Sequence, residues 1–456
     1  MSKDLAPTSP STAQNVDSPE TILRERLENK TASIAVVGMG YVGMPLAHAV
    51  LEAGFNVIGF DVDHRKVDKL NAGECYLHHL GEQMHTDLAT SDRFAATTEA
   101  ARLEAADVIV LCVPTPLGVY REPDLSFVLD STRLVATILR PGQLIVLEST
   151  TYPGTTRDEM KPILEETGFA CGTDFFLAYS PEREDPGRKG VTTKAIPKLV
   201  GGVDDVSTDL AMLLYGAAVE HAHRVSTAEI AESAKILENV YRAVNIALVN
   251  ELKLILDKMD IDIWEVVDAA ATKPFGFQPF YPGPGLGGHC IPIDPFYLSW
   301  KARGVGHATR FIELAGEVNA QMPAHVVSRT IEAMNADGKS LKGSRVLVLG
   351  IAYKPDVDDV RESPAAEIIE RLLEHGALVD YHDPHCPAFP EMRKHDIEMA
   401  SVDLDEATVQ SADCVLIVTD HSAVDYNLVG AAASLVVDTR NAMATVTDPT
   451  ARIVKA

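Results

Sequence analysis

The stretch of chain with the clearest chemical potential is a loop at residues 280–295, FYPGPGLGGHCIPIDP, which carries Cys290 and, four residues later, Asp294. Its four glycines and four prolines exclude a regular helix or strand, since proline fixes φ and glycine lacks a side chain. The alternative is an ordinary surface turn with a spare cysteine, but a short turn does not need so many glycines and prolines. We therefore predict that the backbone of this loop lies close to a bound ligand and that the Cys290 thiol lies next to that ligand.

A cysteine beside a bound ligand suits the oxidation of a primary alcohol all the way to an acid. Hydride transfer alone needs no thiol, but a thiolate can add to the intermediate aldehyde, and the thiohemiacetal can then lose a second hydride. Water releases the acid from the resulting thioester, so an acidic side chain must handle protons. Asp294 and Glu182, which ends a predicted strand, are the candidates.

Lys235 and Asn239 are two further candidates for this chemistry. A helical pattern without glycine or proline covers residues 226–259 and starts with a capping box, Ser226 and Glu229. Lys235 and Asn239 are four apart, so they lie on one face of that helix. A lone lysine on a helix is usually a solvated charge, but the apolar neighbours make a buried functional amine an equal alternative. A buried pair of this kind could stabilise a developing alkoxide.

The elements that must position these groups begin with a dinucleotide-binding pattern. Residues 33–37 are typical of a buried strand, residues 38–43 are GMGYVG, a helical stretch follows, and the next strand ends at Asp61. The glycines allow a tight turn, close approach of a pyrophosphate to a helix N-terminus, and close helix–strand packing. Asp61 would bind an adenosine ribose and repel a 2′-phosphate, which predicts NAD rather than NADP. The alternative is a glycine-rich turn in an ordinary α/β unit.

Two more predicted strands of this region end in polar residues. Residues 106–113 and 144–147 are buried-strand patterns; Thr115 follows the first, and Glu148 and Thr150 follow the second. Because ligands of doubly wound sheets bind at the carboxyl ends of the strands, all three are candidates for the cofactor side. Each could equally be a turn or capping residue.

The same order of elements returns roughly 300 residues later, which indicates a second nucleotide-type α/β domain. Residues 345–350, 412–418 and 435–438 repeat the strand patterns, but GxGxxG is missing. Two cations, Lys354 and Arg361, follow the first of these strands instead. We predict that one domain holds a dinucleotide and the other a different nucleotide.

Composition limits the partners. The chain has 456 residues, 46% of them hydrophobic, which is enough for two or three domains. Its formal net charge of −26 argues against nucleic acid and anionic membrane surfaces as partners. Six scattered cysteines without a CxxC pair predict a reduced, cytoplasmic protein and no metal site. No apolar run reaches membrane-spanning length, and we expect no signal peptide.

Taken together, the motifs resemble those of the UDP-sugar 6-dehydrogenase family from residue 31 to the C-terminus. They are GMGYVG (38–43), FDVD (60–63), VPTP (113–116), EST (148–150), SPER (180–183), AKILENVYRAVN (234–245), PGPGLGGHCIPIDP (282–295), GIAYKPDVDDVRESP (350–364) and DTRN (438–441). Chance agreement in this order is negligible. The resemblance implies oxidation of the sugar C6 hydroxyl to a uronic acid with two NAD per turnover.

The resemblance and the repeated pattern predict one fold: an α/β protein with two Rossmann-like, doubly wound domains joined by a long central helix and a helical dimerisation domain. We expect a flexible tail at residues 1–30 and an NAD-binding domain at residues 31–215. A central helical domain with the cysteine loop would cover residues 216–325, and a UDP-binding domain residues 326–456. We also expect a homodimer or a larger homo-oligomer.

The resemblance further implies roles for single residues. Cys290 would be the nucleophile, Lys235 and Asn239 would polarise the reacting oxygen, Asp294 with a water would be the base, and Glu182 would assist hydrolysis. The predicted catalytic residues are Cys290, Lys235, Asn239, Asp294, Glu182 and Thr150. The predicted cofactor-binding residues are Gly38, Gly40, Tyr41, Val42, Gly43, Asp61, Lys66, Thr115, Thr150 and Arg361. The predicted substrate-binding residues are Glu182, Arg183, Lys235, Asn239, Arg242, Phe280, Tyr281, Gly287 and Lys354. For Phe280 and Tyr281, a place in the core is an equal alternative.

Within the family, several positions resemble the enzymes for UDP-N-acetylhexosamines. Enzymes for UDP-glucose usually carry a lysine where this chain has Ile293, rarely have a histidine where it has His289, and usually lack the YRAVN run at residues 241–245. The loop most resembles that of the UDP-N-acetylglucosamine 6-dehydrogenases. We therefore expect UDP-GlcNAc as the substrate, with UDP-ManNAc or UDP-glucose as alternatives. A two-electron hydroxyacid dehydrogenase is a more distant alternative.

Overall fold

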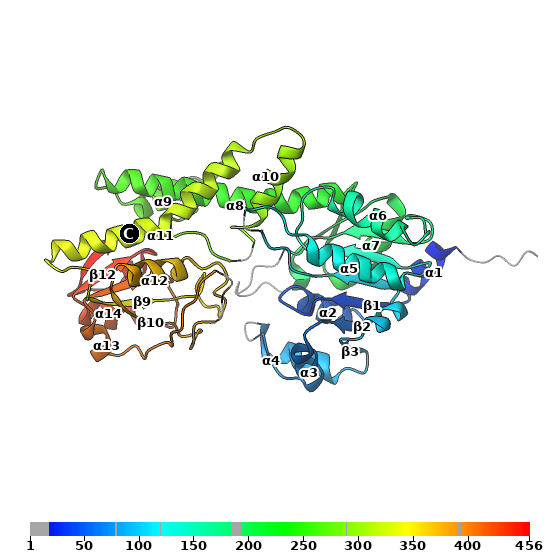
Figure 1. Ribbon diagram of the computed structural model, residues 1–456, viewed down its shortest axis with the longest axis horizontal. Helices are drawn as coiled ribbons and strands as arrows, with labels where there is room; N and C mark the ends of the chain where they lie inside the picture. The colour runs from blue at the N-terminus through cyan, green and yellow to red at the C-terminus, as the bar shows by residue number, and fades with distance from the viewer. Residues whose placement is uncertain are drawn as a thin grey trace, which may run out of the picture.

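The computed structural model describes residues 18–77, 80–118, 120–183, 193–288, 290–390, 392 and 394–456. The chain forms two α/β units, each built on a largely parallel β-sheet, and two long helices run between them (Figure 1). Most of the predicted N-terminal tail and His289 lie outside the described residues.

The first unit contains an eight-stranded sheet in the order β3-β2-β1-β4-β5-β6-β7-β8. All neighbouring strands are parallel except β6 and β7. Its central strands are continuous buried apolar runs, as expected for a sheet covered by helices on both faces. The strands are β1 (Ser33–Val37), β2 (Asn56–Phe60), β3 (Phe94–Thr97), β4 (Val108–Leu111), β5 (Leu144–Leu147), β6 (Phe176–Tyr179), β7 (Lys198–Gly202) and β8 (Ala222–Arg224).

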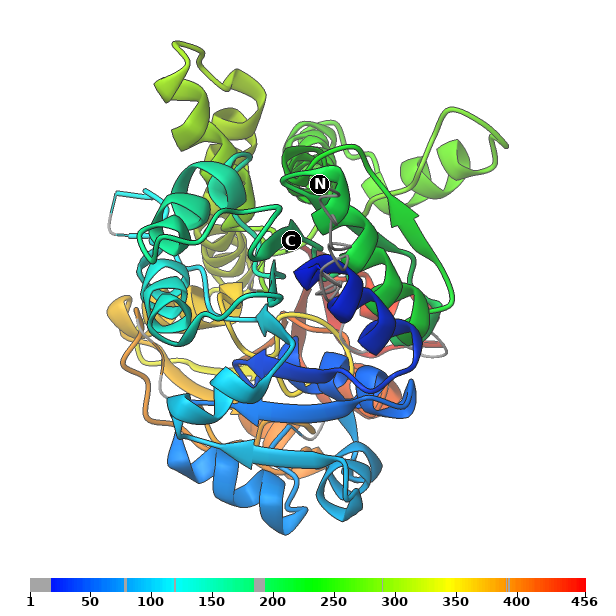
Figure 2. The same ribbon diagram turned by 90° about the vertical axis from the view of Figure 1, so that its right-hand side faces the viewer.

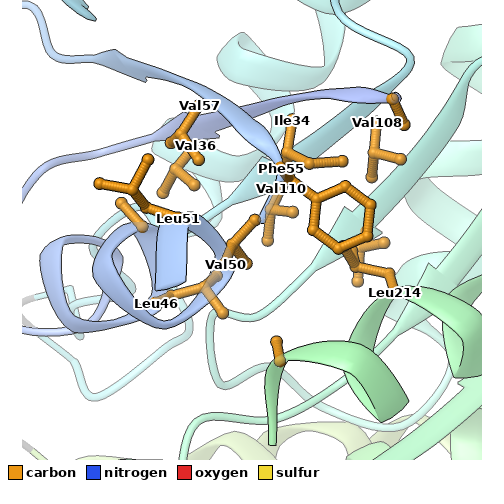
Figure 3. Close-up of a cluster of buried hydrophobic side chains, with 14 of the residues drawn as sticks. Ile34, Val36, Leu46, Val50, Leu51, Phe55, Val57, Val108, Val110 and Leu214 are labelled. Carbon is orange, nitrogen blue, oxygen red and sulfur yellow. The ribbon is translucent and has the colours of Figure 1, made fainter. Parts of the chain in front are cut away.

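Helices pack on both faces of this sheet and give it two cores. They are α2 (Gly43–Glu52), α3 (His64–Ala72), α4 (Glu82–Thr90), α5 (Ser126–Ile138), α6 (Lys161–Glu165) and α7 (Asp205–Ala218). Figure 3 shows one core, in which Val36 and Val110 of the sheet face Val50 of α2 and Leu214 of α7. Because β1, β2, β4 and β5 are parallel, their carboxyl ends share one edge of the sheet.

Helix α1 (Pro19–Glu28) packs against this unit. The sequence predicts a short charged helix at about residues 20–29, which α1 confirms, but it places that helix in a loose tail through residue 30. Leu23 and Leu27, four apart on one face, are each only 2% exposed and belong to the core. The Ser18 side chain caps the helix by accepting from the Thr21 N–H. The tail prediction is therefore wrong for these residues, because the two leucines bury an apolar stripe against α7.

Four helices form the centre of the chain: α8 (Ala228–Asp257), α9 (Ile263–Ala271), α10 (Asp294–Gly304) and α11 (Arg310–Ala336). The predicted long helix is present as α8, but its predicted capping box is not formed. Thr227 rather than Ser226 is the N-cap, without a side-chain hydrogen bond. This shift puts Glu229 at the second helical position, where it pairs with Arg157 at 2.8 Å instead of closing a capping box.

A buried chain of amide groups joins the two long helices to the cysteine loop. The Asn250 Nδ2 of α8 donates to Asn319 Oδ1 of α11 at 2.9 Å, and the Gly283 N–H donates to Asn250 Oδ1 at 3.0 Å. In Figure 1, α8 and α11 lie above the strands of the second unit, and α8 continues toward the helices of the first unit; Figure 2 shows the molecule from its right-hand side. The two long helices therefore hold the cysteine loop in place between the two units.

The second unit contains a five-stranded, fully parallel sheet in the order β10-β9-β11-β12-β13. This order repeats β2-β1-β4-β5-β6 of the first sheet, which confirms the predicted second nucleotide-type domain. Its strands and helices are β9 (Arg345–Leu349), α12 (Pro364–Glu374), β10 (Leu378–His382), α13 (Glu406–Ser411), β11 (Cys414–Ile417), α14 (Tyr426–Ala432), β12 (Leu435–Asp438) and β13 (Arg452–Lys455). The domain borders predicted after residues 215 and 325 both fall inside helices, α7 and α11.

Candidate active site

The glycine-rich turn between β1 and α2 leaves room for a ligand at one position. A Cβ atom on Gly38 would lie 2.4 Å from the Cys112 carbonyl oxygen, and one on Gly43 would lie 1.9 Å from the Gly38 carbonyl oxygen. Packing therefore requires both glycines. A Cβ atom on Gly40 would have no heavy atom within 4 Å, so this backbone is open at the N-terminus of α2, for which Val42 is the N-cap. The arrangement fits a dinucleotide pyrophosphate.

Asp61, the residue after β2, faces the same turn. Its carboxylate is buried and accepts from the Met39 N–H at 3.0 Å and the Asp63 N–H at 2.9 Å. Lys66 Nζ lies 3.2 Å from Asp61 Oδ2, so the structure brings these two predicted cofactor-binding residues together. A carboxylate in this place can accept hydrogen bonds from ribose hydroxyls and disfavours a 2′-phosphate.

The three polar residues predicted at the ends of β4 and β5 differ in their surroundings. Glu148 is buried between the Lys198 amine and the Tyr215 hydroxyl, each at 2.6 Å, so its carboxylate has a structural role. Thr115 is also buried. Thr150 is partly exposed at the end of β5, and of the three it is the best placed to meet a ligand.

The loop that leads to Cys290 is packed tightly against the second unit. The Gly288 N–H donates to the Arg361 carbonyl oxygen at 3.0 Å. A Cβ atom on Gly287 would lie 2.5 Å from Cβ of Tyr353, and one on Gly288, whose φ is +83°, would lie 2.9 Å from the Tyr353 ring. Gly287 and Gly288, two of the four loop glycines, are therefore explained by close packing of the backbone against the Tyr353 side chain, and a ligand is not needed to explain them.

Helix α10 begins directly after this loop and fixes Asp294 near Cys290. The Cys290 carbonyl oxygen accepts from the Asp294 N–H at 2.8 Å. The Asp294 side chain is buried and accepts from Asn239 Nδ2 of α8 at 2.5 Å. The neighbouring Ile293 packs in an apolar cluster with Ile236 of α8.

Lys235 and Asn239 are buried on α8, with side chains 3% and 0% exposed, so the alternative of a solvated lysine is wrong. Lys235 Nζ lies 3.7 Å from Glu182 Oε2, just beyond β6. Arg242 donates to Asn239 Oδ1. The structure thus brings Lys235, Asn239, Glu182 and Arg242 together with the residues at the start of α10.

The charges in this cluster depend on one another. Burial raises the pKa of Cys290 to about 12, with the help of Asp294 and against the effect of Lys235. Burial also raises the pKa of Asp294 to about 7, although Lys235 and Asn239 favour its charged form. Burial acts to lower the pKa of Lys235, but Glu182, Cys290 and Asp294 together raise it. The amine is therefore a cation, the aspartic acid titrates near neutral pH, and the thiol of the ligand-free protein is protonated.

Arg361 extends from the second unit to the dinucleotide-type turn of the first. Its guanidinium carbon lies 4.0 Å from the centre of the Tyr41 ring. The Asp359 carboxylate holds the same guanidinium, with Nη2 and Oδ2 2.6 Å apart. Two residues predicted to bind the cofactor, Tyr41 and Arg361, are thus in contact across the two units.

Two predicted substrate-binding cations already have protein partners. Arg183 pairs with Glu238 of α8, with Nη2 and Oε1 2.6 Å apart, and donates to the Pro197 carbonyl oxygen. Lys354 Nζ lies 5.7 Å from the centre of the Tyr353 ring, beside the cysteine loop.

Phe280 and Tyr281 are held against the central helices. Phe280 packs on the edge of the Tyr241 ring, with ring centres 5.7 Å apart, and on the apolar cluster of α8 and α9. The Tyr281 hydroxyl donates to Asp268 of α9 at 2.6 Å. These contacts favour the alternative that Phe280 belongs to the core, and they give Tyr281 a structural partner.

Arg440 was not predicted as a site residue. It follows β12, and its Nη1 would lie 2.6 Å from a Cβ atom on Gly283 of the cysteine loop. Burial lowers the pKa of Arg440, although Asp420 and Asp438 favour its charged form. A partly buried cation at the carboxyl end of the second sheet could have been found from the sequence, because Arg440 of the DTRN run directly follows a buried-strand pattern.

Glu232, one turn before Lys235 on α8, was not predicted either. Its buried carboxylate accepts from the N–H groups of Gly154 and Thr156 at 2.6 and 2.9 Å, and from the Thr156 hydroxyl at 2.7 Å. These bonds tie the turn after Thr150 to the helix that carries Lys235. The partners are more than seventy residues apart in sequence, with separations of 78 and 76, so no local pattern could reveal them.

Three sections of the chain match one family. Residues 32–219 match the NAD binding domain of the UDP-glucose/GDP-mannose dehydrogenase family, residues 229–321 its central domain, and residues 347–445 its UDP binding domain. Among the residues that the structure describes, no helix is long and apolar enough to cross a membrane.

Individual proteins agree with this match. Protein CapL of Staphylococcus aureus is 36% identical over 391 residues, which are 85% of this chain and 90% of that protein. The UDP-N-acetyl-D-glucosamine 6-dehydrogenase of Pseudomonas aeruginosa is 35% identical over 81% of this chain and 86% of that protein. The structure of a UDP-D-ManNAc dehydrogenase from Pyrococcus horikoshii, 31% identical, aligns with a TM-score of 0.83 over 93% of this chain and 98% of that one. The chain therefore belongs to the UDP-glucose/GDP-mannose dehydrogenase family and is an NAD-dependent UDP-sugar dehydrogenase.

Proposed function

We propose that the protein oxidises the C6 hydroxyl of a UDP-N-acetylhexosamine, with UDP-GlcNAc as the preferred substrate, to the uronic acid in two steps on one cysteine. The observation that carries this proposal is the cluster of Lys235, Asn239 and Asp294 beside Cys290, between the NAD binding and UDP binding units. Similar proteins named for UDP-GlcNAc and for UDP-ManNAc support the substrate class. UDP-ManNAc and UDP-glucose remain the alternative substrates.

In the proposed first step, the C6 oxygen lies against Lys235 and Asn239. The ammonium group and the side-chain amide stabilise negative charge on this oxygen while its proton leaves through a water to Asp294. NAD, when bound, supplies the hydride acceptor for both oxidations. The aldehyde formed in this step stays at the same oxygen-binding position.

Asp294 then releases the first proton to solvent, which restores its carboxylate. In the following step, Cys290 Sγ bonds to C6 of the aldehyde, and the thiol proton passes to the Asp294 carboxylate. The thiohemiacetal oxygen is again stabilised by Lys235 and Asn239. Loss of the second hydride leaves a thioester. A water oriented by Thr150 and Glu182 then attacks C6, the C–S bond breaks, Sγ regains a proton, and the uronate leaves.

The two binding regions follow from the same proposal. We assign NAD to the open turn at Gly40, flanked by Gly38 and Gly43, and to the carboxylate of Asp61. Further cofactor contacts are proposed for Tyr41, Val42, Lys66, Thr115, Thr150 and Arg361. For the UDP-sugar we propose contacts from Glu182 and Arg183 of the first unit, from Arg242 of α8, and from Gly287 and Lys354 on the side of the second unit. Phe280 and Tyr281, which the sequence also predicts as substrate contacts, are assigned a structural role because they pack on or bond to the central helices.

We also propose that the long helix α8 forms the dimer interface of a cytoplasmic homodimer. Five exposed apolar side chains recur on one face of α8 at helical spacing, as expected for a covered stripe. They are Leu237, Tyr241, Leu248, Leu252 and Ile255, and the exposed Met259 follows the end of the helix. Sedimentation velocity would show the mass of a dimer; the mass of a single chain at micromolar concentration would contradict this assignment.

A substrate panel tests the proposed specificity. We expect NADH to form fastest, judged by kcat/KM, with UDP-GlcNAc, and at least about tenfold more slowly with UDP-GalNAc, UDP-ManNAc and UDP-glucose. A sugar that leaves one buried polar group of the site unpaired loses about 1–3 kcal/mol. NADH absorbance gives the rates. A preference for UDP-ManNAc would replace the substrate but keep the reaction, whereas no NADH from any of the four would contradict the proposed function.

The pH dependence should report the ionisation of Asp294. Its pKa is raised to about 7, so the carboxyl group is protonated below that pH and can no longer accept a proton. We therefore expect kcat/KM to fall about tenfold per unit as the pH drops below 7, and Asp294→Asn to abolish this dependence together with most of the activity. Rates between about pH 5.5 and pH 9 give the profile. A flat profile across this range would exclude Asp294 as the base.

A further inference from the structure

One residue of the second unit contacts both the dinucleotide-type turn and the cysteine loop. The Arg361 guanidinium carbon lies 4.0 Å from the centre of the Tyr41 ring of the first unit. The Arg361 carbonyl oxygen accepts from the Gly288 N–H at 3.0 Å, two residues before Cys290. The side chain and backbone of Arg361 therefore join the two places where the cofactor and the reacting sulfur must meet.

Asp359 fixes this arginine. The Asp359 carboxylate accepts from Arg361 Nε at 2.9 Å, from Arg361 Nη2 at 2.6 Å, and from the Arg361 N–H at 3.0 Å. Asp359 is only 4% exposed, so water competes little for these bonds. A paired guanidinium with two parallel bonds to one carboxylate has a fixed direction, which a free arginine side chain lacks.

The backbone of Asp359 extends the same connection. Its carbonyl oxygen accepts from the Tyr353 N–H at 2.9 Å. The Tyr353 side chain in turn packs against Gly287, where an added Cβ atom would lie only 2.5 Å away. Asp359 therefore holds, through different atoms, two of the residues of the second unit that contact the cysteine loop, Tyr353 and Arg361.

We propose that Asp359 is a positioning residue that couples cofactor binding to the placement of the Cys290 loop. This inference rests on the proposed function. A ligand at the Tyr41 turn that stabilises Arg361 in its position against Tyr41 also stabilises the cysteine loop, which is bonded to the Arg361 backbone. NAD and the nucleotide of the second unit should therefore each tighten the binding of the other. Such coupling is reciprocal by thermodynamic necessity.

Calorimetric titration of NAD with and without saturating UDP tests the proposal. In the unaltered protein we expect UDP to lower the Kd of NAD about fivefold or more, and NAD to lower the Kd of UDP by the same factor. In Asp359→Asn, which loses the paired charge but keeps the size of the side chain, each ligand should still bind alone, and the factor should fall close to one.

Two further variants make the outcome decisive. Glu362→Gln removes a neighbouring charge of the same loop that pairs with Lys394 instead, so it should keep the full coupling. Tyr41→Leu removes the other side of the Arg361 contact without changing any residue of the Asp359 loop, so it should lose the coupling. It carries the test if Asp359→Asn does not fold. Retained coupling in Asp359→Asn or Tyr41→Leu, or the absence of coupling in the unaltered protein, would overturn the role of Asp359. The proposed function would be unaffected by these results. Failure of both ligands to bind would overturn the proposed function as well.

Discussion

Cys290→Ala is expected to lower the rate of uronic acid formation at least about a thousandfold, because no thiohemiacetal or thioester can form without Sγ. The first oxidation does not need the sulfur, so a slow release of aldehyde with one NADH is the expected residual activity. Quenched reactions, with the acid and the aldehyde separated by chromatography, measure both products.

Cys171→Ala is the matched control for this variant. Burial raises the pKa of Cys171 to about 12, as it does for Cys290, and the side chain is likewise partly exposed, but it lies in the first unit beside β6. This control should keep its turnover. A Cys290→Ala protein that still makes acid at more than about a tenth of the normal rate would contradict covalent catalysis.

Lys235→Met is expected to lower kcat/KM about a thousandfold, since a buried charge that stabilises an oxyanion contributes roughly 3–4 kcal/mol to the transition state. A second effect follows from the charges. Because Lys235 favours the charged form of Asp294, its removal should raise the pKa of Asp294 and move the acid side of the pH–rate profile to higher pH. The profile of kcat/KM between about pH 6 and pH 10 shows both effects.

Lys253→Met is the control for the Lys235 variant, because it also removes a buried amine from α8 but at a position away from Asp294. Lys253 also lies on α8, is fully buried and pairs with Asp257 at 2.6 Å, but it packs near Trp264 of α9. It should lower the melting temperature without moving the pH–rate profile. If Lys235→Met and Lys253→Met changed the profile equally, the proposed role of Lys235 would be wrong.

Much of the fold could be predicted because it rests on local patterns. Buried-strand runs, GxGxxG and the recurrence of the same element order predict two α/β units with largely parallel sheets. The long helix over residues 226–259 is visible because glycine and proline are missing. The error at Ser226 came from a one-residue shift of the N-cap, which a pattern of four residues cannot resolve.

The site could be predicted only in part, for a physical reason. Lys235 and Asn239 share a face because they share a helix, but their burial depends on the packing of the cysteine loop and Glu182, far away in the sequence. The same holds for Glu148, which the sequence predicts as a candidate for the cofactor side. Its partner Lys198 is fifty residues away in sequence, and the two form a buried ion pair instead. The contact between Arg361 and Tyr41 depends on how the two units meet, and no pattern within one segment encodes that.

The yield of NADH per sugar nucleotide tests the central claim most directly. With limiting UDP-N-acetylhexosamine and excess NAD, the two oxidations on Cys290 should give close to two NADH for each sugar consumed, with uronic acid as the only sugar product. One NADH per sugar with free aldehyde accumulating would contradict the route through a thioester.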